Sequence, residues 1–400
     1  MGQNVYAELC GLTAYRCILR RQPMAALKEF LRHLAGGDAG LDQYAEIFDA
    51  LYGEGYESLA AYLEDHLRYD ESPYAEAAAK GKVPEALAGA AERDIRVLSE
   101  AAALDCAALK TALAAQLPEE FRESVKTLPE WQGSAAFTFA SLTRFYQING
   151  SGDFARYQAF LWQGGEIHPV SDPDYMLLED MWGYERQRSQ VIENTRALMA
   201  GHAVNNVLLY GNSGTGKSAT VKSLLGMPEF EGLRLIEVKK DELTEMSRLV
   251  RMLGHRPQKF IIFIDDLSFD KEDTTFSCIK SILEGGVEPR PVNVAIYCTS
   301  NRRQLIRQNF SDRMGDDMNV NETVQDKTSL ADRFGLRILF DELSRPEYFR
   351  MIMDIARSKG IKAEESLILQ EANKWEIRNP GRCPRSANQF VTSLLTKGVQ

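Results

Sequence analysis

The sequence predicts an α/β protein whose core is a parallel sheet with helices on both faces, preceded and followed by helical regions. Three observations lead to this fold class. Short apolar segments alternate with helical segments between residues 185 and 340, a pattern typical of parallel strands joined by crossover helices. One apolar segment runs directly into a glycine-rich loop. Residues 1–130 and 344–397 have the composition of helices joined by short loops.

The first region, residues 1–170, is predicted to be a mainly helical, acidic domain. Its segment 83–117 is rich in Ala, Leu, Glu and Lys, with Pro84 at its start and Pro118 just past its end, as expected for helices between helix-breaking residues. Residues 1–180 contain 15 Lys and Arg against 28 Asp and Glu, a net charge of −13. This charge disfavours an N-terminal arm that binds nucleic acid and suits a protein-facing or merely solvated surface.

The domain boundary is predicted near residue 170. An aromatic-rich stretch, residues 137–162, precedes it; we expect this stretch to be packed in the interior, and an exposed docking patch is the alternative. A polar, proline-containing segment follows at 169–174 and favours a turn between domains. The sequence therefore predicts an N-terminal domain at 1–170, an α/β domain at 171–340 and a small helical domain, here called the lid, at 341–400.

The α/β region contains the predicted strands and their crossover helices in alternation. The expected strands are Val207–Tyr210, Leu233–Val238, Phe260–Ile264, Val292–Cys298 and Leu336–Phe340. The expected helices are Glu185–Met199, Lys217–Leu225, Asp241–Leu253 and Thr274–Glu284. In the lid, Ser344 and Glu347 have the spacing of a capping box at the start of a helix, and two further helices are expected at 364–377 and 384–397.

The octet after the first predicted strand of this region, GNSGTGKS, fits the phosphate-loop pattern G-x-x-x-x-G-K-[ST] at every fixed position. Its glycines allow successive N–H groups to turn toward an anion, and the following helix adds its positive N-terminal end. A glycine-rich turn without a ligand is the alternative, but the flanking strand and helix disfavour it. We expect the loop to bind ATP, with Lys217 on the β and γ phosphates and Ser218 on Mg²⁺. The predicted nucleotide-binding residues of this segment are Gly211, Asn212, Ser213, Gly214, Thr215, Gly216, Lys217, Ser218 and Ala219.

Two carboxylates follow the predicted strand Phe260–Ile264. The carboxyl ends of parallel strands meet at one edge of a sheet, so this strand should deliver Asp265 and Asp266 to the phosphate loop. Asp265 is expected to orient Mg²⁺, together with Ser218, and Asp266 to activate the attacking water. Two surface acids that cap the next segment are the alternative interpretation.

From residue 171 to 400 these motifs resemble those of the AAA+ ATPases, in the expected order. The residues around Tyr184 look like the segment that packs near the adenine in that family. The triplet TSN at 299–301 resembles sensor 1, which implies that Asn301 helps to hold a water near the γ-phosphate. The segment GRCPR resembles sensor 2, which implies that Arg385 reaches the nucleotide; Arg382, three residues away, is the alternative candidate.

The segment DRFG at 332–335 resembles the AAA+ motif that carries the arginine finger. The resemblance implies that Arg333 stabilises the phosphate being transferred in the neighbouring subunit, so that hydrolysis requires a homo-oligomer, in which a ring-like assembly is an option. A structural Arg333 paired with Asp332 or Asp341 is the alternative.

Several phrases, NNVLLYGNSGTGKS, IDDLSF, TSNRR and ADRFGL, are similar to a bacterial AAA+ family catalogued as a domain of unknown function. The paired acids Asp265 and Asp266 also resemble those of the initiator and helicase-loader branch. This resemblance implies ATP and Mg²⁺ as cofactors and a slow, switch-like, Mg²⁺-dependent ATPase. Two functions remain open: an ATPase that remodels or loads a protein partner selected by the N-terminal domain, and a nucleotide-gated switch that binds DNA or a replication protein.

The remaining composition bears on partners and on location. The basic residues Arg302, Arg303, Arg307 and Arg313 suit a rim for nucleic acid, but the acids between them favour a subunit-interface loop. The six cysteines show no C-x-x-C pair, which favours reduced thiols over a zinc site. No segment is long and apolar enough to cross a bilayer, so we expect a cytoplasmic protein without a membrane partner.

Overall fold

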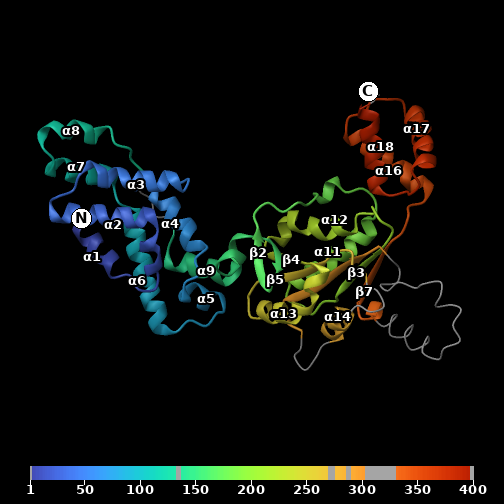
Figure 1. The fold of residues 1–400 in the computed structure, drawn as a ribbon, viewed down its shortest axis with the longest axis horizontal. Coiled ribbons are helices and arrows are strands. Elements are labelled where there is room, and N and C mark those ends of the chain that lie inside the picture. Colours follow the sequence, from blue (N-terminus) through green and yellow to red (C-terminus); the bar gives the residue numbers. More distant parts are fainter. Residues whose placement is uncertain (1, 132–136, 269–274, 285–289, 302–329, 397–400) are drawn as a thin grey trace. The chain divides into compact units, whose positions relative to one another are not determined.

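The computed structural model describes residues 2–131, 137–268, 275–284, 290–301 and 330–396 (Figure 1). The chain divides into two compact units, Met1–Arg156 and Tyr157–Gln400. The first is helical and the second contains the sheet. The predicted α/β fold class with helical regions on both sides is therefore confirmed.

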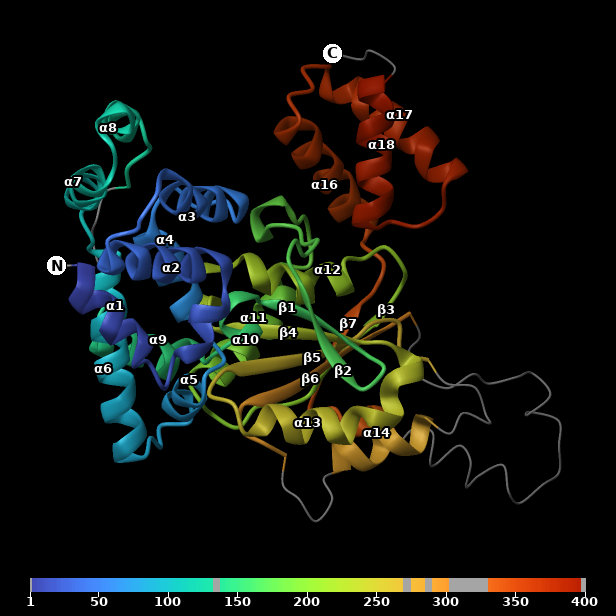
Figure 2. The same cartoon turned by 60° about the vertical axis from the view of Figure 1, so that its left-hand side comes forward.

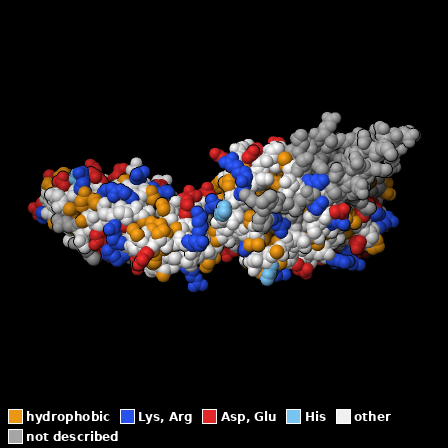
Figure 3. Space-filling model, turned by 90° about the horizontal axis from the view of Figure 1, so that it is seen from below, with side chains coloured by type: hydrophobic (Ala, Val, Ile, Leu, Met, Phe, Trp, Pro, Cys, Tyr) orange, Lys and Arg blue, Asp and Glu red, His pale blue; other side chains and the backbone are white. Residues whose placement is uncertain are grey.

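The first unit buries a core of aromatic and aliphatic side chains, among them Phe30, Tyr44 and Leu98. On the face shown in Figure 3, charged side chains of both signs are intermixed. None of the described helices of the chain is long and apolar enough to span a bilayer. The helices of this unit are α1 (Gly2–Cys10), η1 (Arg16–Arg20), α2 (Gln22–Gly36), α3 (Leu41–Gly53), α4 (Leu59–Arg68), α5 (Pro73–Ala79), α6 (Glu85–Ala102), α7 (Cys106–Gln116), α8 (Glu119–Lys126), α9 (Phe139–Asn149) and α10 (Asp153–Arg156).

Within its described residues, the second unit contains a 7-stranded sheet with the order β2-β1-β4-β5-β6-β3-β7. All neighbouring strands are parallel except the edge pair of β1 and β2. Each strand predicted in the α/β region is present with bounds that differ by at most two residues at either end. The strands are β1 (Ala159–Gln163), β2 (Glu166–Val170), β3 (Val207–Gly211), β4 (Leu233–Val238), β5 (Lys259–Ile264), β6 (Val294–Ser300) and β7 (Leu336–Phe340).

The boundary between the two units precedes β1, whereas the sequence suggested a boundary near residue 170. Strand β1 pairs with β4 from Ala159 opposite Leu235 to Trp162 opposite Val238, so it belongs to the sheet. The proline that suggested a boundary, Pro169, lies in β2, an edge strand in which a missing N–H is tolerated. The aromatic-rich stretch 137–162 is thus shared between the cores of both units, and most of its large side chains are buried, as expected.

Helices cover both faces of the sheet (Figures 1 and 2). Helices α11 and α12 lie on one face, and α13 and α14 lie together on the other. Short 3-10 turns extend α12 and precede α13, where the sequence predicted single longer helices. The helical elements of this part are η2 (Leu178–Asp180), α11 (Glu185–Met199), α12 (Lys217–Lys222), η3 (Ser223–Gly226), η4 (Pro228–Phe230), η5 (Lys240–Glu245), α13 (Met246–Gly254) and α14 (Thr275–Glu284).

After β7 the chain forms the lid, whose helices α16 (Arg345–Ser358), α17 (Glu365–Arg378) and α18 (Pro384–Thr396) pack around their own core. The predicted capping box is present: the N–H of Ser344 donates to Oε2 of Glu347 over 3.0 Å. Tyr348, Ile352 and Ile355 point into the lid core, as the helical periodicity predicts.

Candidate nucleotide-binding site

The phosphate loop follows β3, which lies between β6 and β7 inside the sheet. Its three glycines have positive φ angles, 132° at Gly211, 77° at Gly214 and 91° at Gly216. A Cβ added at Gly211 would lie 2.1 Å from the carbonyl oxygen of Phe340. The glycines of the motif are therefore required by backbone conformation and by close packing, and α12 begins at Lys217 directly behind them.

Lys217 is buried beneath the loop. Its Nζ donates to the carbonyl oxygens of Gly211 and Asn212 over 3.0 and 2.7 Å and to Oδ1 of Asn301 over 2.9 Å. Burial lowers the pKa of Lys217, and the carboxylate of Asp266 opposes this shift in part. The loop thus holds a partly desolvated cation at the place where phosphate oxygens are expected.

Asp265 lies at the carboxyl end of β5, opposite the start of α12. Its Oδ1 accepts hydrogen bonds from the hydroxyls of Ser218, over 2.6 Å, and Thr299. Hydroxyl and carboxylate oxygens are ligands that Mg²⁺ prefers, and this ion takes its other ligands from water and from phosphate. Among the described residues, no group of three or more His, Cys, Asp or Glu side chains is arranged to hold a metal. The residues present therefore fit a Mg²⁺ ion that binds together with a nucleotide.

Asp266 adopts a left-handed backbone conformation with φ 50°. Its N–H donates to Oγ1 of Thr299 over 2.9 Å, and its Oδ1 accepts from Nδ2 of Asn301 over 2.8 Å. Asn301 therefore connects Asp266 with Lys217. Thr299 bonds to both acidic residues, a role that the sequence did not reveal, although β-branched Thr at the end of a buried strand next to two acids is a usable signal.

A cavity of about 760 Å³ opens in front of these groups. The phosphate-loop residues Ser213 to Ala219 line it, as do Asp265, Asp266 and Asn301. Gly211 and Asn212 contribute instead by accepting hydrogen bonds from Lys217. The structure therefore brings the predicted phosphate, metal and water-binding side chains into one space.

An apolar wall closes one side of the cavity. The ring of Tyr184 stacks on Phe340, with 5.1 Å between the centroids, and both line the cavity together with Arg188. Tyr184 has a φ of 59° and its hydroxyl donates to the carbonyl oxygen of Asp341 over 2.6 Å. Apolar and aromatic surfaces of this kind suit a flat base. Sequence analysis placed Tyr184 here but missed the preceding residues Met176, Met181 and Trp182.

The lid supplies another part of the lining. Arg385 lines the cavity, and its N–H donates to the carbonyl oxygen of Gly214 over 3.2 Å. Asn388, Gln389 and Thr392 follow on the same helix; sequence analysis missed them because polar residues on a helix face are usually solvated. Arg382 is bonded elsewhere, so Arg385 is the lid arginine that the structure brings to the cavity.

Arg333 is exposed and is not among the described residues that line the cavity. Strands β3 and β7 are parallel, with Val207 opposite Leu336 and Gly211 opposite Phe340. Arg333 precedes β7, so it lies toward the amino end of the sheet, whereas the phosphate loop leaves the carboxyl end. At a rise of about 3.3 Å per residue, roughly 15 Å of strand separates these ends. The predicted basic rim at Arg302, Arg303, Arg307 and Arg313 lies outside the described residues.

The family model described as "Protein of unknown function (DUF815)" matches residues 155–398. No curated protein matches the sequence. Among solved structures, one single-residue variant of Thermotoga maritima RuvB is 18% identical and has a TM-score of 0.36; the match covers 56% of this chain and 66% of RuvB, just under two thirds.

Two further solved structures show similar values. Aeropyrum pernix Orc1 in complex with DNA is 17% identical, with a TM-score of 0.37, and the match covers 58% of this chain and 63% of Orc1. The initiator DnaA, bound to AMPPCP and single-stranded DNA, is 17% identical with the same TM-score, and the match covers 57% of this chain and 66% of DnaA. At these TM-scores the likenesses support no statement about function. The AAA+ fold rests on the parallel sheet, the phosphate loop and the helical lid described above.

Proposed function

Because this chain belongs to the DUF815 family and its cavity joins a phosphate loop, two carboxylates and a lid, we propose that it is an Mg²⁺-dependent AAA+ ATPase. The observation that carries the proposal is the common cavity of Lys217, Asp265, Asp266 and Asn301. A protein that only bound a phosphate would need the loop and the lysine. A second carboxylate held in place by an amide is what the alignment of an attacking water requires.

Each side chain has a role that its position supports. The loop N–H groups and Lys217 hold the phosphates, and Ser218 and Asp265 hold Mg²⁺, which neutralises charge on the phosphate oxygens. Asp266 orients the attacking water and accepts its proton. Asn301, bonded to Asp266, keeps that carboxylate facing the γ-phosphate.

Hydrolysis is proposed to require a second subunit. Arg333 lies too far from the phosphate loop of its own chain to act there, because β7 lies between them. In an oligomer it can reach the nucleotide of a neighbour and stabilise the transition state. The helical first unit is then free to select the protein partner that the ATPase remodels or loads.

A slow nucleotide-gated switch that acts on DNA or a replication protein is the second candidate. It is favoured by the hydrogen bond that Lys217 donates to Asn301. Phosphate oxygens must replace Asn301 at Lys217 before hydrolysis can proceed, which suits slow turnover. In this second candidate, bound ATP changes the affinity of the chain for its partner, and hydrolysis only returns the chain to its starting state.

ATP turnover per subunit, measured over a wide range of protein concentrations, tests the proposal. We expect turnover to rise with concentration and to fall by at least about a hundredfold in Lys217→Ala and in Arg333→Ala. Arg337→Ala is the matched control, because Arg337 is a nearby exposed arginine that pairs with Asp332 over 2.7 Å; its turnover should stay close to that of the wild type.

Mixing the two inactive variants tests whether the site is shared. A Lys217→Ala subunit keeps its Arg333, and an Arg333→Ala subunit keeps its phosphate loop, so mixed oligomers contain some complete sites. Partial recovery of turnover is expected. Turnover that is independent of concentration, with no recovery on mixing, would refute the shared site. Stimulation by single-stranded DNA that weakens with salt would favour the switch over the remodelling ATPase.

A further inference from the structure

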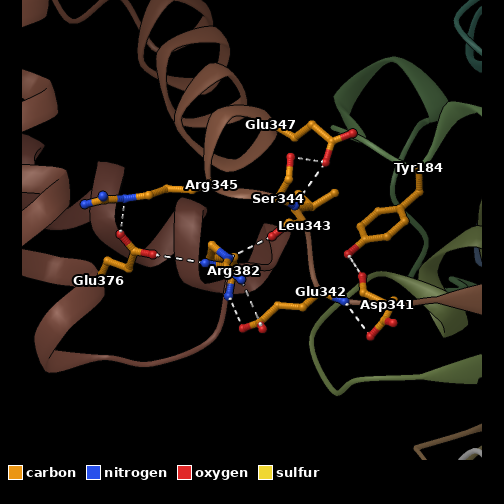
Figure 4. A network of polar contacts seen from close by, with 9 residues as sticks. All are labelled: Tyr184, Asp341, Glu342, Leu343, Ser344, Arg345, Glu347, Glu376 and Arg382. Atoms are coloured by element: carbon orange, nitrogen blue, oxygen red, sulfur yellow. Dashed lines mark hydrogen bonds and ion pairs between the residues drawn. The ribbon is translucent and has the colours of Figure 1, made fainter.

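A short linker, residues 341–344, joins β7 to the lid and pairs with the chain just before α18 (Figure 4). The N–H of Leu343 donates to the carbonyl oxygen of Arg382 over 3.1 Å. In return, the N–H of Arg382 donates to Oε1 of Glu342 over 2.9 Å. Two segments 40 positions apart in sequence are thus held side by side by reciprocal hydrogen bonds.

The side chain of Arg382 strengthens this pairing and extends it to a third segment. Its Nε donates to the carbonyl oxygen of Leu343 over 2.7 Å, and its guanidinium forms ion pairs with Glu342 over 3.6 Å and with Glu376 over 3.5 Å. Glu376 lies on α17 and also accepts from Nε of Arg345 over 3.1 Å. One guanidinium therefore connects the linker, α17 and the segment that leads into α18.

The same segment meets the phosphate loop three residues later. The N–H of Arg385 donates to the carbonyl oxygen of Gly214 over 3.2 Å. A Cβ at Gly214 would lie 3.0 Å from Sγ of Cys383 and 3.1 Å from Cβ of Arg385, so a side chain at this position would crowd the start of α18. The position of α18 relative to the linker thus decides how far Arg385 reaches into the cavity.

The linker is also connected to the apolar wall of the cavity. The hydroxyl of Tyr184 donates to the carbonyl oxygen of Asp341, and the ring of Tyr184 stacks on Phe340. Both of these rings line the cavity. The contacts therefore form a continuous path from the apolar wall, through the linker and Arg382, to Arg385.

We propose that Arg382 is a positioning residue that sets the place of Arg385 at the nucleotide by fixing the start of α18 to the linker. The inference rests on the proposed function, since Arg385 acts only when a nucleotide is bound. Arg382 is not among the described residues that line the cavity. Its removal therefore acts through Arg385 and has no effect of its own on the phosphates.

A double-mutant cycle on the full chain tests this role. ATP turnover, and the affinity for a non-hydrolysable ATP analogue, are measured for Arg382→Ala, Arg385→Ala and the double variant. We expect each single change to lower kcat/KM by roughly tenfold to a hundredfold and the double variant to be no worse than Arg385→Ala alone. Arg357→Ala is the control, because Arg357 pairs with Asp354 and Glu365 within the lid, away from the linker.

Two outcomes would overturn the proposal. One is an Arg382→Ala variant with the kcat/KM and analogue affinity of the wild type. The other is a double variant in which the fold losses of the two single variants multiply, as expected when Arg382 only stabilises the lid. Thermal unfolding checks that the variants are folded, and Glu342→Gln weakens the same contact if Arg382→Ala does not fold. If the proposed ATPase function itself is wrong, the wild type lacks turnover that depends on Lys217, and this outcome differs from a failure of the role proposed for Arg382. The cycle in analogue affinity still tests Arg382 in that case.

Discussion

The sheet side and the lid side of the nucleotide cavity are held in different ways. On the sheet side, Asp265, Asp266 and Asn301 follow buried strands, and their side chains bond to one another and to α12. On the lid side, Arg385 is exposed, and its N–H makes one backbone hydrogen bond to the loop. The sheet side is therefore organised before a nucleotide binds, and the place of the lid side depends on the linker.

This difference suggests a division of work. Side chains that must align a water molecule tolerate little displacement, since about 1 Å can cost on the order of a hundredfold in rate. They belong on strands that are paired on both sides, as β5 and β6 are. A side chain that responds to the nucleotide state belongs on an element that a short linker joins to the sheet. A substitution on the sheet side should therefore change kcat more than nucleotide affinity, and a substitution on the lid side should change affinity more than kcat.

The largest effect is expected from Thr299→Val, which keeps the shape of the side chain and removes its hydroxyl. The Thr299 Oγ1 accepts the N–H of Asp266 and donates to Asp265. Without it, the N–H of Asp266 loses its hydrogen bond to Thr299 and keeps the longer one to Oδ1 of Asp265, over 3.1 Å, so its left-handed conformation is held less firmly. We expect kcat to fall on the order of a hundredfold with little change in affinity for an ATP analogue, measured by steady-state kinetics and calorimetry.

Thr392→Val is the matched control, because Thr392 lines the lid side of the same cavity. It should alter affinity more than kcat. If Thr299→Val weakened binding and left kcat intact, the division between an aligning wall and a responding wall would be wrong.

The second effect concerns the charge of Lys217. Burial lowers the pKa of this lysine in the free protein, and phosphate binding requires its protonated form. As pH rises through the lowered pKa, a growing fraction of the free protein must be protonated before it binds. Affinity for an ATP analogue should therefore fall by up to about tenfold per pH unit, beginning below the pH at which an exposed lysine loses its proton.

Lys217→Arg provides the comparison, since a guanidinium stays protonated over this range. Its affinity is expected to be lower than that of the wild type but nearly independent of pH above about pH 8. Identical pH profiles for the two proteins would show that some other group titrates.

The sequence predicted the sheet side of the cavity better than the lid side. The phosphate loop and the Asp pair are local patterns whose chemistry fixes their place, and parallel strands bring such patterns to one edge of a sheet. The capping residues of α16 are local in the same sense. Each of these features can be predicted because a few residues that are close in sequence determine it.

Features that depend on distant contacts escaped prediction. The sequence could not choose between Arg382 and Arg385, because the choice depends on Glu342 and Glu376, which are brought to Arg382 by the packing of the linker and α17. Strand β1 was missed because it joins the sheet by pairing with β4, a strand that lies far along the chain. Spacing within a motif contains no information about such partners.

The smallest effect is expected where the lid begins, at the cap of α16. Glu347 accepts from both the N–H and the hydroxyl of Ser344, and these hydrogen bonds lower the pKa of its carboxyl group. Glu347→Gln should cost about 0.5 kcal/mol of lid stability, less than a buried cap because Glu347 is exposed.

A lowered pKa in the folded state stabilises the fold above the ordinary pKa of glutamate, and this contribution is lost as pH falls through the lowered value. Hydrogen exchange of the α16 amides should therefore separate Glu347→Gln from wild type at neutral pH and not at acid pH. Glu364→Gln is the control, because Glu364 precedes α17 and its side chain makes no cap hydrogen bond. Because the cap orders only the lid side, kcat should not change. A loss of kcat in Glu347→Gln would mean that the first turn of α16 helps to align the sheet side as well.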